Sequence, residues 1–223
     1  MADGLASAGS RVAVLDRQAP AGDLAWEQVD LADGSGVADA VGSLAAATGW
    51  PDQLVLCAGI AGSTTPIGEL TATEWDHVLA VNLTGGFLVL SLVLPRMRER
   101  GWGRVVTFSS GTAVRPGPGV AAYAASKAGV IALTKVVALE AAADGVTANC
   151  VAPGVTLTPL MTDALGSQQA VLDLATASPL ANPQGEVLLP FEVADAAVYL
   201  CSDGAGRITG QVLQVNGGSL MPG

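Results

Sequence analysis

The chain has 223 residues, of which 50% are hydrophobic and only 13% are charged. A chain of this length and composition buries a sizeable core, so wholesale disorder is excluded. Acidic residues outnumber basic ones by 20 to 10, and the resulting net charge of −10 disfavours nucleic acids and anionic membrane surfaces as partners.

Short apolar runs predict the strands of a parallel sheet. The run 54–58 is apolar throughout and is closed by Gly59, which is typical of a strand buried on both faces. The sequence predicts strands, in chain order, at 12–15, 26–29, 54–58, 105–108, 146–151 and 212–215.

Longer helical patterns lie between these strands, at 37–48, 71–100, 121–143 and 191–201. Thr71 and Glu74 form a capping box that starts the second helix, and Gly101 stops it after an arginine-rich last turn. The alternation of strands and helices predicts an α/β fold, a doubly wound parallel sheet with helices on both faces, in a single domain over residues 1–223.

Residues 156–190 are predicted to be mostly irregular, with a weak helical pattern at 167–175. Because this segment follows the carboxyl end of a strand, where such sheets bind ligands, we interpret it as a substrate lid; the alternative is a surface excursion without a role. Its apolar residues suggest a pocket wall or ordinary core: Leu157, Leu160, Met161, Leu165, Leu172 and Leu174.

The residue inventory excludes several kinds of site. His77 is the single histidine and the three cysteines, Cys57, Cys150 and Cys201, include no CxxC pair, so no metal site is expected. Each cysteine stands in an apolar run, which predicts reduced, buried thiols in a cytoplasmic protein. No signal peptide is apparent, and the apolar-rich stretch 87–94 is too short to span a bilayer.

The most informative stretch runs from Ser110 to Lys127. Tyr123 and Lys127 are four residues apart on one predicted helix, so they share a face, and an ammonium beside a phenol lowers the pKa of the phenol. Ser110 ends the preceding strand and is placed to bind the same substrate oxygen. The alternative is an exposed tyrosine beside a solvated lysine.

Six segments, two of which contain Ser110, Tyr123 and Lys127, make the chain resemble the short-chain dehydrogenase/reductase family, from about Asp3 onward. The segments that carry the resemblance are 56–60 (LCAGI), 81–85 (VNLTG), 103–110 (GRVVTFSS), 123–129 (YAASKAG), 151–154 (VAPG) and 208–218 (ITGQVLQVNGG). The resemblance implies a Rossmann-like fold and a catalytic tetrad. In it Asn82 holds a helix kink and a water, Ser110 orients the substrate, Tyr123 transfers the proton, and Lys127 lowers the pKa of Tyr123 and binds the nicotinamide ribose.

The resemblance also implies a dinucleotide site. Asp16 ends the strand beside which the adenosine ribose would lie, and a carboxylate there favours NAD over NADP, whereas the neighbouring Arg17 favours a 2′-phosphate. The other implied cofactor positions, besides Tyr123 and Lys127, are Asp30, Leu31, Cys57, Ala58, Gly59, Pro153, Gly154, Val155 and Thr158.

The sequence departs from the family at its start, where the first strand and the glycine-rich TGxxxGxG loop are missing, so that the expected fold is N-terminally truncated. Three outcomes are open: the true start lies upstream, the 12–15 strand closes up against the 54–58 strand, or the N-terminal part is mobile or pairs with another subunit. In the last two cases we expect weaker NAD binding, or none, because the pyrophosphate loses its backbone donors.

Three functional hypotheses follow. The first is an NAD-dependent oxidoreductase acting on a secondary alcohol or ketone of apolar character. The second is a cofactor-independent enzyme, of isomerase, dehydratase, aldol or cyclase type, that uses the same Ser-Tyr-Lys site. The third is a non-catalytic subunit that pairs with a complete homologue. The resemblance further implies a homodimer or homotetramer packed through the helices at 73–100 and 121–143.

Overall fold

The structure is a computed structural model that describes residues 1–177 and 181–221. Its strands are β1 (Ala13–Asp16), β2 (Ala25–Gln28), β3 (Gln53–Leu56), β4 (Gly103–Phe108), β5 (Val146–Pro153) and β6 (Val212–Val215). Its helices are α1 (Ala2–Ser7), α2 (Gly34–Thr48), α3 (Ala72–Leu79), α4 (Gly85–Arg100), α5 (Ala121–Ala141), α6 (Pro159–Leu165), α7 (Gln168–Ala177) and α8 (Pro190–Cys201).

The strands form two separate parallel sheets. β1 pairs with β2, and the other strands form a sheet in the order β3-β4-β5-β6. Of the three outcomes left open by the sequence, the one in which the 12–15 strand closes up against the 54–58 strand is therefore not observed, since β1 and β3 are not paired.

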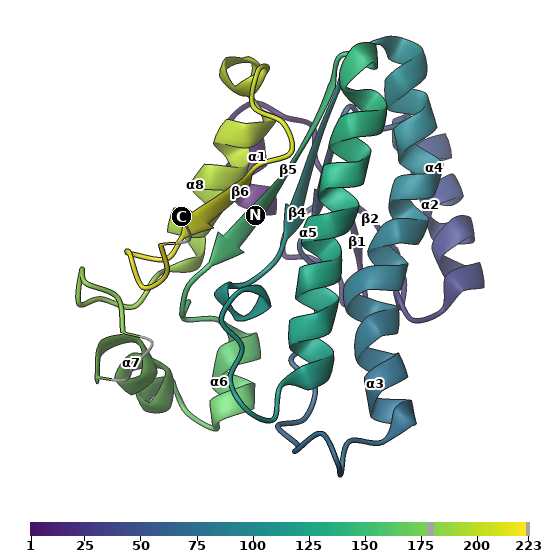
Figure 1. Ribbon diagram of the computed structural model, residues 1–223. Helices are drawn as coiled ribbons and strands as arrows, with labels where there is room; N and C mark the ends of the chain where they lie inside the picture. Colours follow the sequence, from purple (N-terminus) through teal and green to yellow (C-terminus); the bar gives the residue numbers. More distant parts are fainter. Residues whose placement is uncertain (178–180, 222–223) are drawn as a thin grey trace.

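Helices cover both faces of the four-stranded sheet, as predicted, and the fold is Rossmann-like (Figure 1). α2, α4 and α5 lie on one side, where Val93, Met97 and Val105 belong to the larger core. α8, with the short α1 against it, covers the other side, where Val106, Val151 and Leu200 form a second core. The carboxyl ends of the strands point to the lower edge in Figure 1.

The helix ends follow the predicted caps. Thr71 and Glu74 form the complete capping box at the start of α3. Gly101 after α4 and Gly145 after the last turn of α5 take left-handed backbone conformations, which a glycine adopts without steric cost. The predicted helix 71–100 is interrupted by one π-helical turn, Ala80–Thr84.

The segment 156–190 is more regular than predicted, because it contains the helices α6 and α7. Thr158 caps α6 by accepting a hydrogen bond from the Met161 backbone, and α7 buries Val171 and Ala175 rather than its leucines. Leu160 and Leu165 remain 37% and 39% exposed. Positions 178–180 of the predicted lid lie outside the described residues.

Two helical stretches, Ala72–Arg100 and Ala121–Asp144, are long and apolar enough to cross a membrane by length and composition. Both are longer than the apolar stretch 87–94 considered from the sequence. Both pack on the sheet, with Val93 of α4 and Val137 of α5 buried in the larger core. Their apolar character is therefore that of core helices.

Candidate active site

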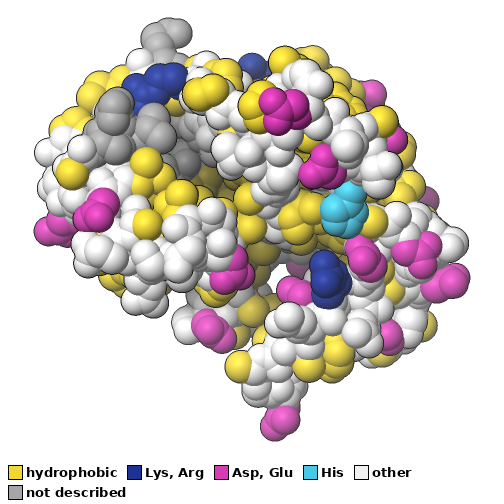
Figure 2. Space-filling view, turned by 90° about the horizontal axis from the view of Figure 1, so that it is seen from below, with side chains coloured by type: hydrophobic (Ala, Val, Ile, Leu, Met, Phe, Trp, Pro, Cys, Tyr) yellow, Lys and Arg dark blue, Asp and Glu magenta, His cyan; other side chains and the backbone are white. Residues whose placement is uncertain are grey.

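A cavity of about 1580 Å³ lies between β1 and β3 and opens at the carboxyl ends of the strands. Figure 2 looks onto this edge and shows a hollow with hydrophobic side chains inside and acidic side chains around it. Nine of the predicted site residues line the cavity: Asp16, Arg17, Asp30, Leu31, Cys57, Ala58, Gly59, Asn82 and Thr158. Six others do not: Ser110, Tyr123, Lys127, Pro153, Gly154 and Val155.

Asn82 links the cavity to the predicted catalytic group. It lies in the π-helical turn, 5% exposed, and its amide Oδ1 accepts from the Ile60 N–H at 2.8 Å while Nδ2 donates to the Ile60 carbonyl at 2.9 Å. Nδ2 also donates to Ser126 Oγ at 3.1 Å. Asn82 thereby ties the loop after β3 to α5 and fixes the wall of the cavity.

Lys127 lies beside Tyr123 on α5, one helical turn away. Its Nζ is 5.8 Å from the centre of the Tyr123 ring and donates to the Phe108 carbonyl at 3.0 Å. A Cβ atom at Gly59 would lie 3.3 Å from Nζ and 3.1 Å from Asn82 Oδ1, so the loop after β3 packs closely against the lysine and the asparagine. The lysine head group therefore faces the end of the cavity near Gly59.

The pKa of Tyr123 is opposite in direction to the expectation. Burial raises the pKa of this phenol, and a hydrogen bond with Ser110 offsets part of the rise. Burial also lowers the pKa of Lys127. Desolvation decides the pKa shift here because both groups lie away from water and the ammonium sits over the ring rather than beside the phenolic oxygen.

Ser110 follows β4 and caps the short 3₁₀ turn Gly111–Ala113, accepting from the Thr112 N–H at 3.2 Å. Its neighbour Ser109 is buried and donates to the Lys127 carbonyl at 2.8 Å. The end of β4 is thus fastened to α5, and Ser110, Tyr123 and Lys127 form one group.

Sequence reasoning missed Ser126. This fully buried hydroxyl accepts from Asn82 and donates to the Tyr123 carbonyl at 2.7 Å. Its place directly before Lys127, inside an otherwise alanine-rich helix, was the available signal.

Several predicted cofactor residues lie outside this group, at the carboxyl ends of other strands. Asp16 ends β1 as an exposed carboxylate, and its Oδ1 accepts the Gln18 N–H at 3.0 Å. Asp30 follows β2 and accepts from the Ala32 N–H at 2.9 Å. Gly154 is packed against Asn216, since a Cβ there would lie 2.9 Å from the Cα atom of Asn216.

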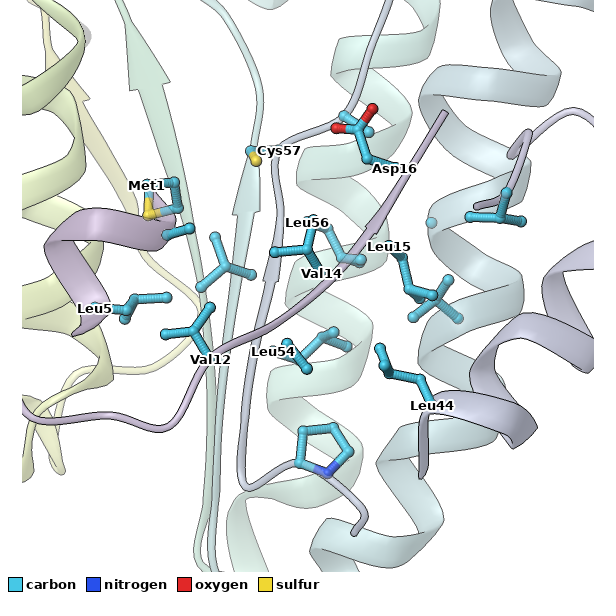
Figure 3. A pocket seen from close by; sticks show the side chains of 18 of the residues that line it. Met1, Leu5, Val12, Val14, Leu15, Asp16, Leu44, Leu54, Leu56 and Cys57 are labelled. Carbon is cyan, nitrogen blue, oxygen red and sulfur yellow. The ribbon is translucent and has the colours of Figure 1, made fainter. Parts of the chain in front are cut away.

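The expectation of three buried thiols is wrong for Cys57, although Cys150 and Cys201 are buried. Cys57 directly follows the half-buried strand β3, and its side chain faces the cavity (Figure 3). No strand pairs with the edge of β3 that faces β1, and Cys57 at the end of β3 is therefore left exposed. Desolvation within the cavity still raises the pKa of the Cys57 thiol.

The parallel sheet and the polar groups at its carboxyl edge define a Rossmann-type α/β oxidoreductase fold, and the comparisons with known proteins agree. A family profile described as enoyl-(acyl carrier protein) reductase matches residues 1–219. The chain is 32% identical over 203 residues to a D-beta-hydroxybutyrate dehydrogenase of Rhizobium meliloti, covering 88% of this chain and 78% of that one. It is 35% identical over 230 residues to a D-threitol dehydrogenase of Mycolicibacterium smegmatis, covering 98% and 86%.

Among solved structures, one from Brucella melitensis named ribose-5-phosphate isomerase superposes with a TM-score of 0.90 at 34% identity, covering 100% of this chain and 87% of that one. The chain belongs to the short-chain dehydrogenase/reductase family. Members of this family bind small-molecule substrates, generally use NAD or NADP, and commonly form oligomers.

Proposed function

We propose that this protein is an NAD-dependent oxidoreductase that interconverts a secondary alcohol and a ketone. The observation that carries the proposal is the group formed by Ser110, Tyr123 and Lys127, with the phenol and the ammonium on one face of α5 and Ser110 near enough to lower the pKa of the phenol. The dehydrogenase relatives support redox chemistry at this group.

In this proposal Tyr123 holds or accepts the proton of the substrate oxygen, and Ser110 binds the same oxygen. Lys127, fixed by the Phe108 carbonyl, supplies a positive charge near the proton donor. Asn82 acts as a positioning residue, because its bonds to Ile60 and Ser126 hold the loop at Gly59 against α5. Leu160 of α6, which lines the cavity, favours an apolar substrate.

The residues present fit the two ends of a dinucleotide. Asp16, Asp30 and Leu31 would hold the adenosine end, whereas Ala58, Gly59 and Lys127 would hold the nicotinamide ribose, near which a side chain at Gly59 would crowd Asn82 and Lys127. Pro153, Gly154, Val155 and Thr158 complete the proposed set. The described residues contain no glycine-rich turn for the pyrophosphate between these ends. When bound, the nicotinamide would supply or accept the hydride.

The preference for NAD rests on Asp16 and is testable by titration. We expect NADH to bind more tightly than NADPH, because the carboxylate accepts from the ribose hydroxyls and repels a 2′-phosphate. Asp16→Ala should reduce the ratio of the two dissociation constants by about tenfold, measured by nicotinamide fluorescence.

Asp39→Ala, which removes an exposed carboxylate of α2 outside the cavity, is the matched control and should leave the ratio unchanged. An unchanged ratio in Asp16→Ala would contradict the assignment of Asp16. Failure of the unaltered protein to bind either cofactor would contradict the NAD proposal itself.

A second candidate function is isomerisation without a cofactor, favoured by the similarity to the structure named ribose-5-phosphate isomerase. The same Ser110 and Tyr123 would polarise a carbonyl for enolisation. Exchange of α-protons of a ketone or ketose with solvent deuterium, without added cofactor, would distinguish this candidate from the first. The non-catalytic hypothesis predicts that neither assay shows activity.

For the assembly and location of the protein we propose a homodimer or homotetramer in the cytoplasm. Large apolar side chains are exposed on α4 and α5, namely Phe87 at 49%, Val136 at 47% and Leu139 at 84%. Apolar groups on neighbouring helices are a suitable interface for a second copy.

A further inference from the structure

The π-helical turn Ala80–Thr84 packs closely against α5. The turn lies between α3 and α4, and in Figure 1 these helices run beside α5. A Cβ atom at Gly129 of α5 would lie 2.7 Å from Cδ2 of Leu83, so the helix and the turn approach closely at this point. The approach brings Asn82, the neighbour of Leu83, within hydrogen-bonding distance of Ser126. Single π-helical turns inside helices are frequent at functional sites.

Ser126 uses its hydroxyl in two directions at this contact. The hydroxyl hydrogen is donated to the Tyr123 carbonyl at 2.7 Å, so the oxygen has lone pairs left to accept from Asn82 Nδ2 at 3.1 Å. In the part of the chain that the structure describes, the bond to Asn82 is the only hydrogen bond between the π-helical turn and α5. Ser126 therefore connects the helix of the catalytic group to a different element.

Asn82 carries this connection on to the loop after β3. Its Oδ1 accepts from the Ile60 N–H, and the two hydrogens of Nδ2 go to the Ile60 carbonyl and to Ser126. Because Asn82 is a buried residue, removal of the serine hydroxyl would leave one of its N–H groups without an acceptor. The loop at Ile60 is thus held against α5 through the Asn82 amide.

The loop that is held in this way borders the ammonium of Lys127. A Cβ atom at Gly59 would lie close to both Lys127 Nζ and Asn82 Oδ1, so these two groups face the same point of the loop. Nζ donates to the Phe108 carbonyl, and among the described residues no carboxylate forms an ion pair with it. The position of the ammonium therefore depends on a backbone carbonyl and on the packing of this loop rather than on an ion pair.

We propose that Ser126 is a positioning residue: through Asn82 it holds the loop after β3 against the ammonium of Lys127. Its bond to the Tyr123 carbonyl fixes the direction of the hydroxyl hydrogen and so makes the oxygen the acceptor for the Asn82 amide. This inference deepens the proposed function and rests on it for the effect on the reaction rate. The position of the loop can be tested without it.

The first test follows the loop and needs neither substrate nor cofactor. The Ile60 amide donates to Asn82 Oδ1, so its rate of hydrogen exchange reports whether the loop is held. In the full chain, Ser126→Ala should speed the exchange of this amide by about tenfold, the effect of losing one hydrogen bond. The amides of α8, which lies on the opposite face of the sheet, should exchange as before. Circular dichroism establishes that each variant is folded.

Two matched controls separate this role from a general loosening of the protein. Ser91→Ala removes an exposed serine of α4 that makes the same bond to the carbonyl three residues earlier. Thr134→Val removes a buried hydroxyl of α5 that contacts Thr107 at 2.7 Å. Thr134→Val should lower the melting temperature, but both controls should leave the exchange of the Ile60 amide unchanged, because neither hydroxyl bonds the asparagine.

The second test links the loop to the reaction. Ser126→Ala should lower kcat of ketone reduction by about tenfold with little change in KM, as expected of a residue that positions the reacting groups and does not bind substrate. Asn82→Ala should also lower kcat. Adding Ser126→Ala to Asn82→Ala should have no additional effect, because the hydroxyl acts through the asparagine.

Three outcomes would overturn the proposal: unchanged exchange of the Ile60 amide in folded Ser126→Ala, equally faster exchange in Thr134→Val, or separate losses of kcat that multiply in the double variant. Faster exchange in Ser126→Ala, together with no ketone reduction by the unaltered protein, would support the role of Ser126 in holding the loop and would contradict the proposed function instead.

Discussion

Tyr123→Phe should lower the rate of ketone reduction by about 10²- to 10⁴-fold, the usual contribution of a positioned proton donor. The substitution removes only the hydroxyl and leaves the ring beside Lys127. Reduction of a panel of ketones and 3-oxoacyl thioesters, followed by NADH absorbance, measures the effect.

Binding of NADH and the melting temperature should stay the same in Tyr123→Phe, because the ring and its packing are retained. The matched control is Tyr199→Phe, which changes an exposed tyrosine of α8 and should leave the rate unchanged. A Tyr123→Phe variant that keeps more than about a tenth of the activity would remove Tyr123 from the proton-transfer role.

The direction of the Tyr123 pKa shift predicts how the rate depends on pH. Burial raises the pKa of this phenol, so the phenolate that accepts a proton in alcohol oxidation is scarce at neutral pH. Oxidation should therefore become faster as the pH rises through the alkaline range, whereas reduction, which needs the protonated phenol, should stay level until the same range. A rate of oxidation that levels off below neutral pH would contradict this assignment.

Gly145→Ala should be among the most destabilising single-methyl changes in the chain, with an expected loss of about 3 kcal/mol or more in the free energy of unfolding. Gly145 has φ +74° at the turn before β5, and a Cβ there would overlap the carbonyl oxygen of Gly101 at the end of α4. The cost combines an unfavourable backbone conformation with a clash against backbone that cannot rotate away.

Gly166→Ala separates these two contributions. Gly166 also has a positive φ, +82°, but a Cβ there meets no atom within 4 Å, so only the backbone cost of about 1 kcal/mol applies. Urea unfolding of the two variants measures the difference. Equal losses would show that the turns at Gly101 and Gly145 do not contact each other as described.

Much of the fold was predictable from local pattern. The strand at 212–215 has its predicted bounds, and the capping box at Thr71 and the stop at Gly101 were read directly, because caps and turns depend on neighbouring residues. That Tyr123 and Lys127 share one face of a helix could be predicted from helical periodicity alone. The helices α6 and α7 were harder to predict, because their helical pattern in the sequence is weak and α7 buries only Val171 and Ala175 among its residues.

Other properties depend on which segments meet in space. The pKa of Tyr123 follows from burial rather than from its neighbouring lysine, and the role of Ser126 depends on Asn82, which is 44 residues away. The contact of Gly145 with Gly101 and the exposure of Cys57 likewise depend on which strands and turns lie side by side. The sequence by itself thus determined the elements, the family and the candidate catalytic residues, since these depend on residue type and spacing. Only the tertiary structure decided that β1 stands apart from β3, because strand pairing is a long-range contact set by how the helices pack.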